Sequence, residues 1–328
     1  MTEKILVILK ENKDFISGEK IAKLLNVSRA AVWKNISKLK NMGYNIISVT
    51  NKGYLLVENN FLFNKLEIEK ELNTFVLGKN IYFFEEINST NDYAKKLINS
   101  NIEIEEGTLI VADCQTSGKG RLDRKWESNK GDGIFLSLIL KPDIELFSIM
   151  QVTLLAGICV CKAINSITGL NAKIKWPNDI IINNKKVCGI LTEVNAQIDK
   201  VSYIILGIGI NVNNQKFDVA LGDKATSIFL ETNKNIERQK IIANLLKEFE
   251  NNYFKYIKEK DFSIFLDEYK SLCININQVC KLIYHKKEII GKVIDISPLG
   301  EIIFETENEI LKIVSGEVSL RSINGNYI

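Results

Sequence analysis

Apolar residues recur at spacings of three and four along the first forty residues, which predicts three short helices. Ser17 and Ser28 precede the second and third helical patterns and are suited to N-capping. A hairpin pattern follows over residues 44–57, with Gly53 able to adopt a positive φ in its turn. The order of helix, helix-turn-helix and hairpin predicts a winged helix-turn-helix domain over residues 1–60. The apolar sets are Ile5, Leu6 and Leu9; Ile21, Leu24 and Leu25; and Val32, Ile36 and Leu39.

The pattern then changes to an alternation of strand-like runs and helices, which predicts an α+β domain over residues 64–270. Beyond it, short strands separated by glycine turns predict a small C-terminal β-barrel over residues 271–328. We expect helices at 91–98 and 147–167. The strand-like runs cover residues 81–85, 108–112, 134–140, 173–176, 187–194 and 201–213.

Composition and hydropathy favour a globular cytoplasmic protein. Apolar residues make up 46% of the 328 residues and charged residues 25%, which is enough for a core. The first residues lack a secretory pattern, and the most apolar stretch, residues 149–164, is short for a membrane span and is interrupted by Gln151 and Lys162. We therefore expect no membrane association.

Charge is distributed unevenly along the chain. Residues 1–57 contain ten basic residues and four acidic ones, which gives a net charge of +6. Because the whole chain has a net charge of +3, the remaining residues have a net charge of −3. A basic N-terminal module indicates an anionic partner. Within it, residues 28–40 have four basic residues and no acidic one, as a DNA recognition helix requires. We expect operator DNA to contact Ser28, Arg29, Ala30, Trp33, Lys34, Ser37 and Lys38, although Trp33 fits internal packing equally well.

Cysteine and histidine usage excludes several chemistries. The six cysteines have no paired two-residue spacing and the only histidine is His285, so we predict buried free thiols and no protein-bound metal. A single histidine also disfavours a Ser-His or Cys-His catalytic pair. Catalysis must therefore depend on other groups.

A glycine loop is the first segment that indicates ligand binding. Residues 115–126 follow a strand and hold two glycines, Gly118 and Gly120, with four basic residues and Trp126. Glycines allow backbone N–H groups to approach an anion, which Lys119 and Arg121 can neutralise. Taken alone, the loop is also consistent with a solvated basic turn.

Four further motifs accompany this loop, and together they resemble the biotin protein ligase family over nearly the whole chain. They are Ser89-Thr90-Asn91, residues 175–179 (KWPND), residues 186–193 (KVCGILTE) and residues 207–211 (GIGIN), and residues 315–321 are similar to that family's C-terminal domain. The N-terminal module matches the repressor-type members. The resemblance implies a class-II-synthetase-like α+β ligase domain and an SH3-like C-terminal barrel.

The resemblance also implies roles for individual residues. Ser89, Thr90, Asn91 and Gln115 would lie around the ureido ring of biotin, and backbone groups at Gly207 and Gly209 would close the pocket. Gly118, Lys119, Gly120 and Arg121 would order over biotin and its adenylate, and Trp126 would pack on the adenine. Asn211 and Arg321 would lie near the nucleotide, and Lys186 would contact the biotin carboxylate and the α-phosphate. Arg121, Lys186 and Asp179 are the catalytic candidates, with Asp179 positioning either Mg²⁺ or the acceptor amine.

Simpler interpretations exist for some of these residues. Ser89 or Thr90 could serve only as a helix N-cap, and Gly207 and Gly209 could be bulge residues in a buried strand. Trp176 and Pro177 fit a scaffold better than ligand contacts. Lys119 and Asp123 stand where many relatives have arginine and glycine.

The implied reaction uses ATP and Mg²⁺ to form biotinyl-5'-AMP and then transfers biotin to a lysine of a biotin carboxyl carrier protein of acetyl-CoA carboxylase. The adenylate-bound form would be a homodimer and a biotin-responsive repressor. Alternatives are a lipoate ligase, a repressor that senses ligand without ligase activity, and a ligase whose N-terminal domain no longer binds DNA.

Overall fold

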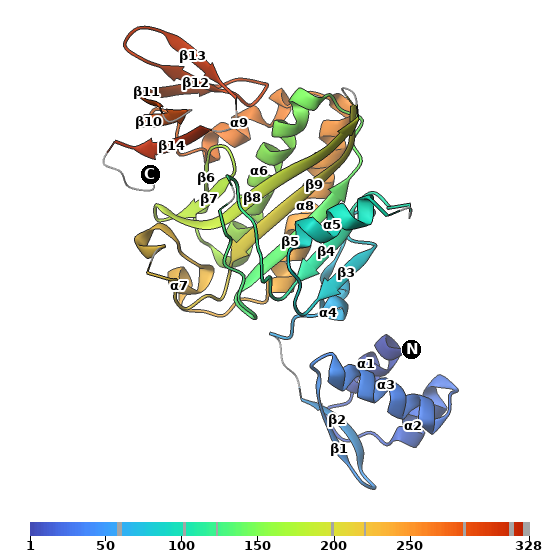
Figure 1. The fold of residues 1–328 in the computed structure, drawn as a ribbon. Helices are drawn as coiled ribbons and strands as arrows, with labels where there is room; N and C mark the ends of the chain where they lie inside the picture. The colour runs from blue at the N-terminus through green and yellow to red at the C-terminus, as the bar shows by residue number, and fades with distance from the viewer. Residues whose placement is uncertain are drawn as a thin grey trace. The chain divides into compact units, whose positions relative to one another are not determined.

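The computed structural model describes residues 1–57, 61–100, 103–122, 124–197, 200–219, 221–284, 287–314 and 318–323 (Figure 1). The chain forms two compact units, Met1–Lys70 and Glu71–Ile328. His285, Asp123 and residues 315–317 of the C-terminal motif lie outside the described residues.

The first unit is a helix-turn-helix with a β-hairpin wing. Its helices are α1 (Thr2–Glu11), α2 (Gly18–Leu25) and α3 (Arg29–Asn41), and its strands are β1 (Asn45–Val49) and β2 (Gly53–Val57), with α4 (Lys65–Glu71) at its end. β1 and β2 pair antiparallel. The predicted caps and turn are confirmed. Ser17 Oγ accepts from the N–H of Lys20 and Ser28 Oγ from that of Ala31, each at 3.1 Å, and Gly53 has φ +106°.

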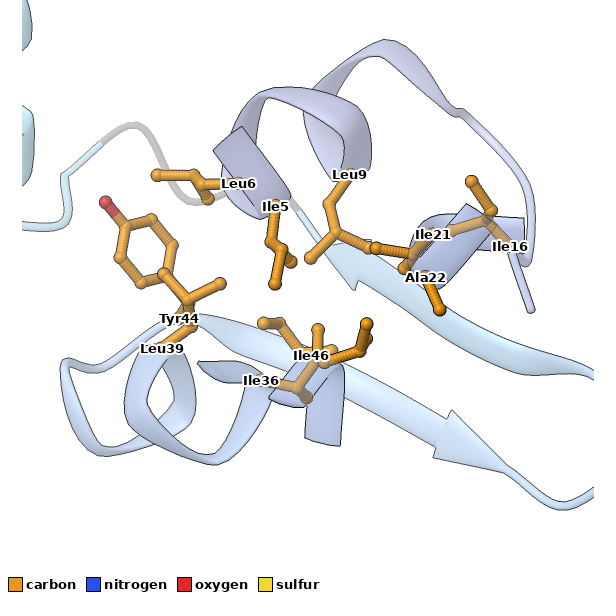
Figure 2. Packing of buried hydrophobic residues seen from close by; sticks show 11 residues of the cluster. Ile5, Leu6, Leu9, Ile16, Ile21, Ala22, Ile36, Leu39, Tyr44 and Ile46 are labelled. Atoms are coloured by element: carbon orange, nitrogen blue, oxygen red, sulfur yellow. The ribbon is translucent and has the colours of Figure 1, made fainter. Parts of the chain in front are cut away.

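One apolar cluster holds this unit together, because each helix turns its periodic apolar face inward (Figure 2). Ile5 and Leu9 of α1, Ile21 of α2 and Ile36 of α3 all have exposed fractions of 2% or less. Burying an aliphatic side chain of this size contributes about 1.5–3 kcal/mol. The cluster therefore fixes the orientation of α3, whose opposite face remains exposed.

The second unit is built on a seven-stranded sheet in the order β3-β4-β5-β9-β8-β7-β6. Only β3 and β4 are parallel; the other neighbours are antiparallel. Helix α5 contacts β4, β5 and β9 on one face, whereas α6 packs on β8 and α8 on β5. The strands are β3 (Ile81–Phe84), β4 (Thr108–Ala112), β5 (Gly133–Leu140), β6 (Lys173–Lys175), β7 (Asp179–Ile182), β8 (Lys185–Gln197) and β9 (Lys200–Asn211).

The helices of this unit are α5 (Thr90–Ile98), α6 (Ile149–Thr168), α7 (Ile228–Thr232), α8 (Arg238–Glu259) and α9 (Ser263–Leu272), with short 3₁₀ turns Leu146–Ser148 and Gly222–Lys224. Together with the first of these turns, α6 is long and apolar enough to cross a membrane, which differs from the short span predicted for residues 149–164. Most of that stretch is buried, as expected for the central helix of a core. The sequence analysis did not anticipate α8, α9 or β7.

The C-terminal part is a five-stranded antiparallel sheet in the order β13-β12-β11-β10-β14, which confirms a β-rich C-terminal domain. Its strands are β10 (Val279–Tyr284), β11 (Lys287–Ile296), β12 (Ile302–Glu305), β13 (Ile310–Ile313) and β14 (Val318–Ser322). Trp176 anchors this sheet to the larger one, because its indole N–H donates to the carbonyl of Gly300 at 3.0 Å. Trp176 is 2% exposed, and it also lines the outer of the two pockets described below.

All six cysteines are free thiols. Five are buried, and only Cys114 is partly exposed. Burial raises the pKa of the Cys159 thiol to about 12 and that of Cys273 to about 11. The prediction of buried free thiols is therefore confirmed for five of them.

Candidate ligand site on the larger sheet

Two adjoining pockets open on the face of the larger sheet that carries α5. The inner pocket is lined by the Ser89-Thr90-Asn91 turn, Gln115 and the glycine loop, over residues 207–209 of β9. The outer pocket lies between the same loop, the 175–179 turn and Arg321 of β14. Arg121, Trp126, Asn178 and Lys186 line both. The structure thus brings together every residue predicted to bind biotin or nucleotide, apart from Gly118.

Three glycines form the floor of the site. Gly189 of β8 is paired with Gly209 of β9, and Gly207 lies two residues along the same strand, so all three face the same side of the sheet. A methyl group added at Gly209 would lie 2.6 Å from Cε2 and Nε1 of Trp126, and one at Gly207 would overlap Asn91. The alternative of bulge residues is wrong, because the β8–β9 register is regular through Gly207 and Gly209.

Trp126 lies against this floor, beside Lys186. The Nζ atom of Lys186 is 5.2 Å from the centre of the Trp126 ring, within cation–π range. Among the described residues, the buried Nε1–H of Trp126 has no hydrogen-bond partner. With the indole in this place the inner cavity measures about 50 Å³ and the outer one about 450 Å³. Because ligand pockets usually measure roughly 300–1,000 Å³, the indole must move to admit a ligand to the inner pocket.

The polar wall of the inner pocket is set by α5 and β5. Ser89 Oγ accepts from the N–H of Asp92 at 3.3 Å, so Ser89 is the N-cap of α5 and also lines the pocket. Gln115 Oε1 accepts from the N–H of Thr90 at 2.8 Å, and its Nε2 donates to Ser128 at 3.0 Å. Ser137 of β5 lies 2.7 Å from Thr90 Oγ1. Ser137 escaped the sequence analysis because a lone serine in an apolar strand gives no signal.

The glycine loop folds back on itself. Gly120 N–H donates to the carbonyl of Arg124 at 2.7 Å, and Trp126 N–H to that of Gly118 at 2.9 Å. A Cβ added at Gly118 would lie within 2.8 Å of Trp126 O and Ser128 Oγ. Gly118 therefore allows the two arms of the loop to pack closely and contributes to its structure. Lys119 forms an ion pair with Asp92 at 2.8 Å.

The cations of the site are held by polar partners. Arg121 Nη1 donates to Asn178 Oδ1 at 2.7 Å, and Asn178 Nδ2 donates to the carbonyl of Ile190 at 2.8 Å. Lys186 pairs with Asp179 at 2.5 Å. Asn178 therefore orients the guanidinium of Arg121, and Asp179 orients the ammonium group of Lys186. The role of Asn178 was not predicted, although its motif was recognised.

Lys175 is the most unusual charge in the outer pocket. Its exposed fraction is 5%. Its pKa is lowered to about 7, mainly by burial; Asp179 opposes this shift, and the nearby Arg321, Lys186 and Arg124 contribute to it. Basic side chains outnumber acidic ones in this pocket, where the described carboxylates are Glu127 and Asp179. The outer pocket is therefore suited to a polyanion such as a nucleotide phosphate chain.

The predicted DNA-contacting residues all lie at the start or along the length of α3. Trp33 is 64% exposed, so the alternative of internal packing is wrong within the unit as described. Arg29, Trp33 and Ser37 are spaced by four residues and share one face of the helix. That face combines a cation, an aromatic ring and a hydroxyl group.

A β-sheet ligand site beneath a basic glycine loop, with an N-terminal helix-turn-helix unit, defines a protein ligase of the biotin and lipoate class joined to a DNA-binding domain. Residues 83–211 match the Biotin/lipoate A/B protein ligase family, residues 2–55 an HTH domain, and residues 276–321 the Biotin protein ligase C terminal domain.

Similarity to known proteins extends over both units. The chain is 41% identical to the Bifunctional ligase/repressor BirA of Bacillus subtilis over 94% of each chain, and 29% identical to that of Escherichia coli over 97% of this chain and 96% of the other. It is similar to a biotin protein ligase from Aquifex aeolicus in complex with biotin and ATP, with TM-score 0.66, 34% identity, and coverage of 74% of this chain and 99% of that one. The chain belongs to the bifunctional biotin protein ligase and repressor family.

Proposed function

We propose that this protein joins biotin to ATP as biotinyl-5'-AMP and transfers the biotin to a lysine of a biotin carboxyl carrier protein of acetyl-CoA carboxylase. The observation that carries the proposal is the pair of adjoining pockets that share Arg121, Trp126 and Lys186. One pocket suits a small ring and the other a nucleotide, and the shared residues lie where the two ligands would react. The carrier assignment follows from the family.

In the first step the biotin carboxylate attacks the α-phosphorus of ATP, and pyrophosphate leaves. Both reactants are anions, so the Arg121 guanidinium and the Lys186 ammonium offset their repulsion and stabilise charge on the α-phosphate. Asn178 and Asp179 hold these two cations in place. Mg²⁺ would supply further charge neutralisation of the phosphates. Asp179 and Glu127 offer it only two described carboxylates, which fits an ion that arrives with ATP and keeps several waters.

In the second step the carrier lysine attacks the acyl carbon of the mixed anhydride, an amide bond forms and AMP leaves with the anhydride electrons. The attacking amine loses a proton, which passes to solvent. Asp179 lines the outer pocket and can orient that amine while paired with Lys186. The cytoplasm supplies the ATP, the carrier and the DNA that the two units require.

The N-terminal unit would bind operator DNA as part of a biotin-responsive repressor. The exposed cations of α3 suit the phosphate backbone, and its exposed face suits the major groove. We propose that the adenylate promotes a homodimer, since a two-fold dimer matches a palindromic operator. Sedimentation with and without biotin plus ATP tests this, and a mass unaffected by ligand refutes it.

The ligase proposal is tested by exchange of labelled pyrophosphate into ATP. We expect exchange with biotin and none with lipoate. Exchange with lipoate alone would indicate a lipoate ligase, and absence of exchange with either acid would indicate a ligand-sensing repressor. Labelling of a purified carrier domain from the same cell then tests the transfer step.

A further inference from the structure

One buried arginine contacts both ends of the connection between β4 and β5, which contains the glycine loop. Arg238 is the first residue of α8 and is 6% exposed. Its Nη1 donates to Asp113 Oδ1 at 2.7 Å, directly after β4, and to the carbonyl of Gly133 at 2.8 Å, at the start of β5. Asp113 Oδ1 also accepts from the N–H of Gly131 at 3.1 Å. The two ends of this connection are therefore joined at one point.

The segment that follows β9, residues 212–226, is attached at the same place. The carbonyl of Asp132 accepts from the N–H groups of the first two residues after β9, at 3.2 and 2.6 Å. The second of these residues, Asn213, forms two side-chain hydrogen bonds with the backbone of Ile236, at 2.9 and 3.1 Å. Ile236 lies two residues before Arg238. The start of α8 is thus joined to the bases of both segments.

These two segments border the two ligand pockets. The glycine loop lines both pockets, and its Trp126 has to move before a ligand can enter the inner one. The segment after β9 lines the outer pocket with Phe217, Leu221 and Lys224. Neither Arg238 nor Asn213 lines either of these pockets, so any effect of these two residues on ligand binding passes through the segments that they hold.

We propose that Arg238 is a positioning residue that couples the two pockets, so that biotin in the inner pocket raises the affinity for a nucleotide in the outer one. The inference rests on the proposed function, which supplies the two ligands. Ordering a segment around a ligand costs conformational entropy. Because Arg238 and Asn213 join both segments to α8, ordering one also restricts the other, and the second ligand has less entropy to remove. By linkage the nucleotide raises the affinity for biotin by the same factor.

A guanidinium suits this junction better than an ammonium group does. Its planar fork holds its donors in fixed directions, and Nη1 of Arg238 contacts both ends of the β4–β5 connection. A lysine side chain is one bond shorter. Arg238→Lys therefore keeps a positive charge near Asp113, which limits the loss of stability that follows when a buried ion pair is broken, but it does not hold both ends.

The test is titration calorimetry of full-length protein with biotin, with and without a saturating ATP analogue that has a methylene group between the α- and β-phosphorus atoms. This analogue cannot form the adenylate, so both affinities are equilibrium values. Wild type should bind biotin about tenfold or more tightly with the analogue, and Arg238→Lys about threefold or less. Coupling that remains passes through Arg121 and Lys186, which line both pockets.

A second variant acts on the other side of the junction. Asn213→Ala removes the two hydrogen bonds to Ile236 and should also reduce the coupling factor. The double variant Arg238→Lys/Asn213→Ala should show little further loss, because both changes break the same junction. If Arg238→Lys does not fold, Asn213→Ala alone decides the outcome.

Glu250→Gln is the matched control, on the same helix. Glu250 is 5% exposed, and its carboxylate accepts from the three N–H groups of residues 75–77 at 2.6, 2.8 and 2.7 Å. Residues 75–77 line neither ligand pocket. Glu250→Gln should therefore lower thermal stability, as the loss of a buried charged partner does, and leave the coupling factor at its wild-type value.

The wild-type coupling factor in Arg238→Lys, or a factor of one in wild type, would overturn the role of Arg238. An equal loss of coupling in Glu250→Gln would also overturn it, because the effect would then follow from stability alone. In each of these cases biotin-dependent pyrophosphate exchange by the wild type would still support the ligase. Absence of both that exchange and biotin binding would overturn the proposed function as well.

Discussion

Replacing Gly209 with alanine tests the glycine floor directly. The new Cβ would lie 2.6 Å from two indole atoms of Trp126, whereas carbon atoms in contact normally lie about 3.5–4.0 Å apart. The ring must therefore retreat by about 1 Å from its present place against Gly209. Overpacking of this kind costs about 1–3 kcal/mol, equivalent to about 5- to 150-fold in an equilibrium constant.

We expect the substitution to affect ligand binding more than folding, because the indole can move outward, whereas the added methyl group stays on the floor of the inner pocket and takes space from biotin. Titration calorimetry should show weaker binding of biotin by a factor within that range, and Trp126 fluorescence should change in the absence of ligand. Gly157→Ala is the matched control. Gly157 lies in α6, and an added methyl would be 3.5 Å from Ile174, an ordinary contact.

The control variant should be neutral or slightly stabilising, since alanine favours a helix by about 1 kcal/mol over glycine. Unchanged biotin affinity together with unchanged Trp126 fluorescence in Gly209→Ala would refute the arrangement of the indole on the glycine floor. An equal loss of thermal stability in Gly209→Ala and Gly157→Ala would refute the view that Gly209 differs from a glycine of the core.

Three further predictions concern charges. Arg121→Gly should retain some adenylation but release the adenylate faster, so that lysines of added albumin become labelled with biotin; labelling confined to the carrier would refute a retaining role. The double variant Lys34→Ala/Lys38→Ala should bind DNA more weakly and with less salt dependence, and its adenylation activity should be unchanged. DNA binding equal to that of wild type at several salt concentrations would contradict the placement of α3 on DNA. The Lys175 side chain has a pKa of about 7 in the free protein, and bound phosphate favours its ammonium form, so ATP binding at pH 8 should take up as much as about one proton. Calorimetry in buffers of different ionisation enthalpy should show this uptake in wild type and not in Lys175→Met.

Local patterns predicted the elements of this protein well. The caps at Ser17 and Ser28, the turn at Gly53 and the strand Thr108–Ala112 all depend on residues close in sequence. Helix α8 was missed although Ile241, Ile242, Leu245, Leu246 and Phe249 have helical spacing and are buried. Its signal was present and could have been found by the same reasoning.

The site was predictable as a set of residues but not as an arrangement. The pairing of Gly189 with Gly209 depends on strand register, and Glu193 meets Asn91 from 102 positions away. The low pKa of Lys175 arises from burial by a turn, the loop and the C-terminal sheet together. Such properties come from tertiary packing, so motifs identify the participants without giving their contacts.

The distribution of thiols has a practical consequence for studying the glycine loop. Five cysteines are buried, and only Cys114 is partly exposed, directly before Gln115. Burial, and then the nearby Glu86 and Asp113 carboxylates, raise the Cys114 pKa, so its thiolate is scarce near neutral pH. A maleimide dye under mildly alkaline conditions should thus attach at one position without prior removal of other cysteines. A reporter placed there lies beside the inner pocket, and energy transfer from tryptophan to it would test whether the glycine loop moves during a single turnover.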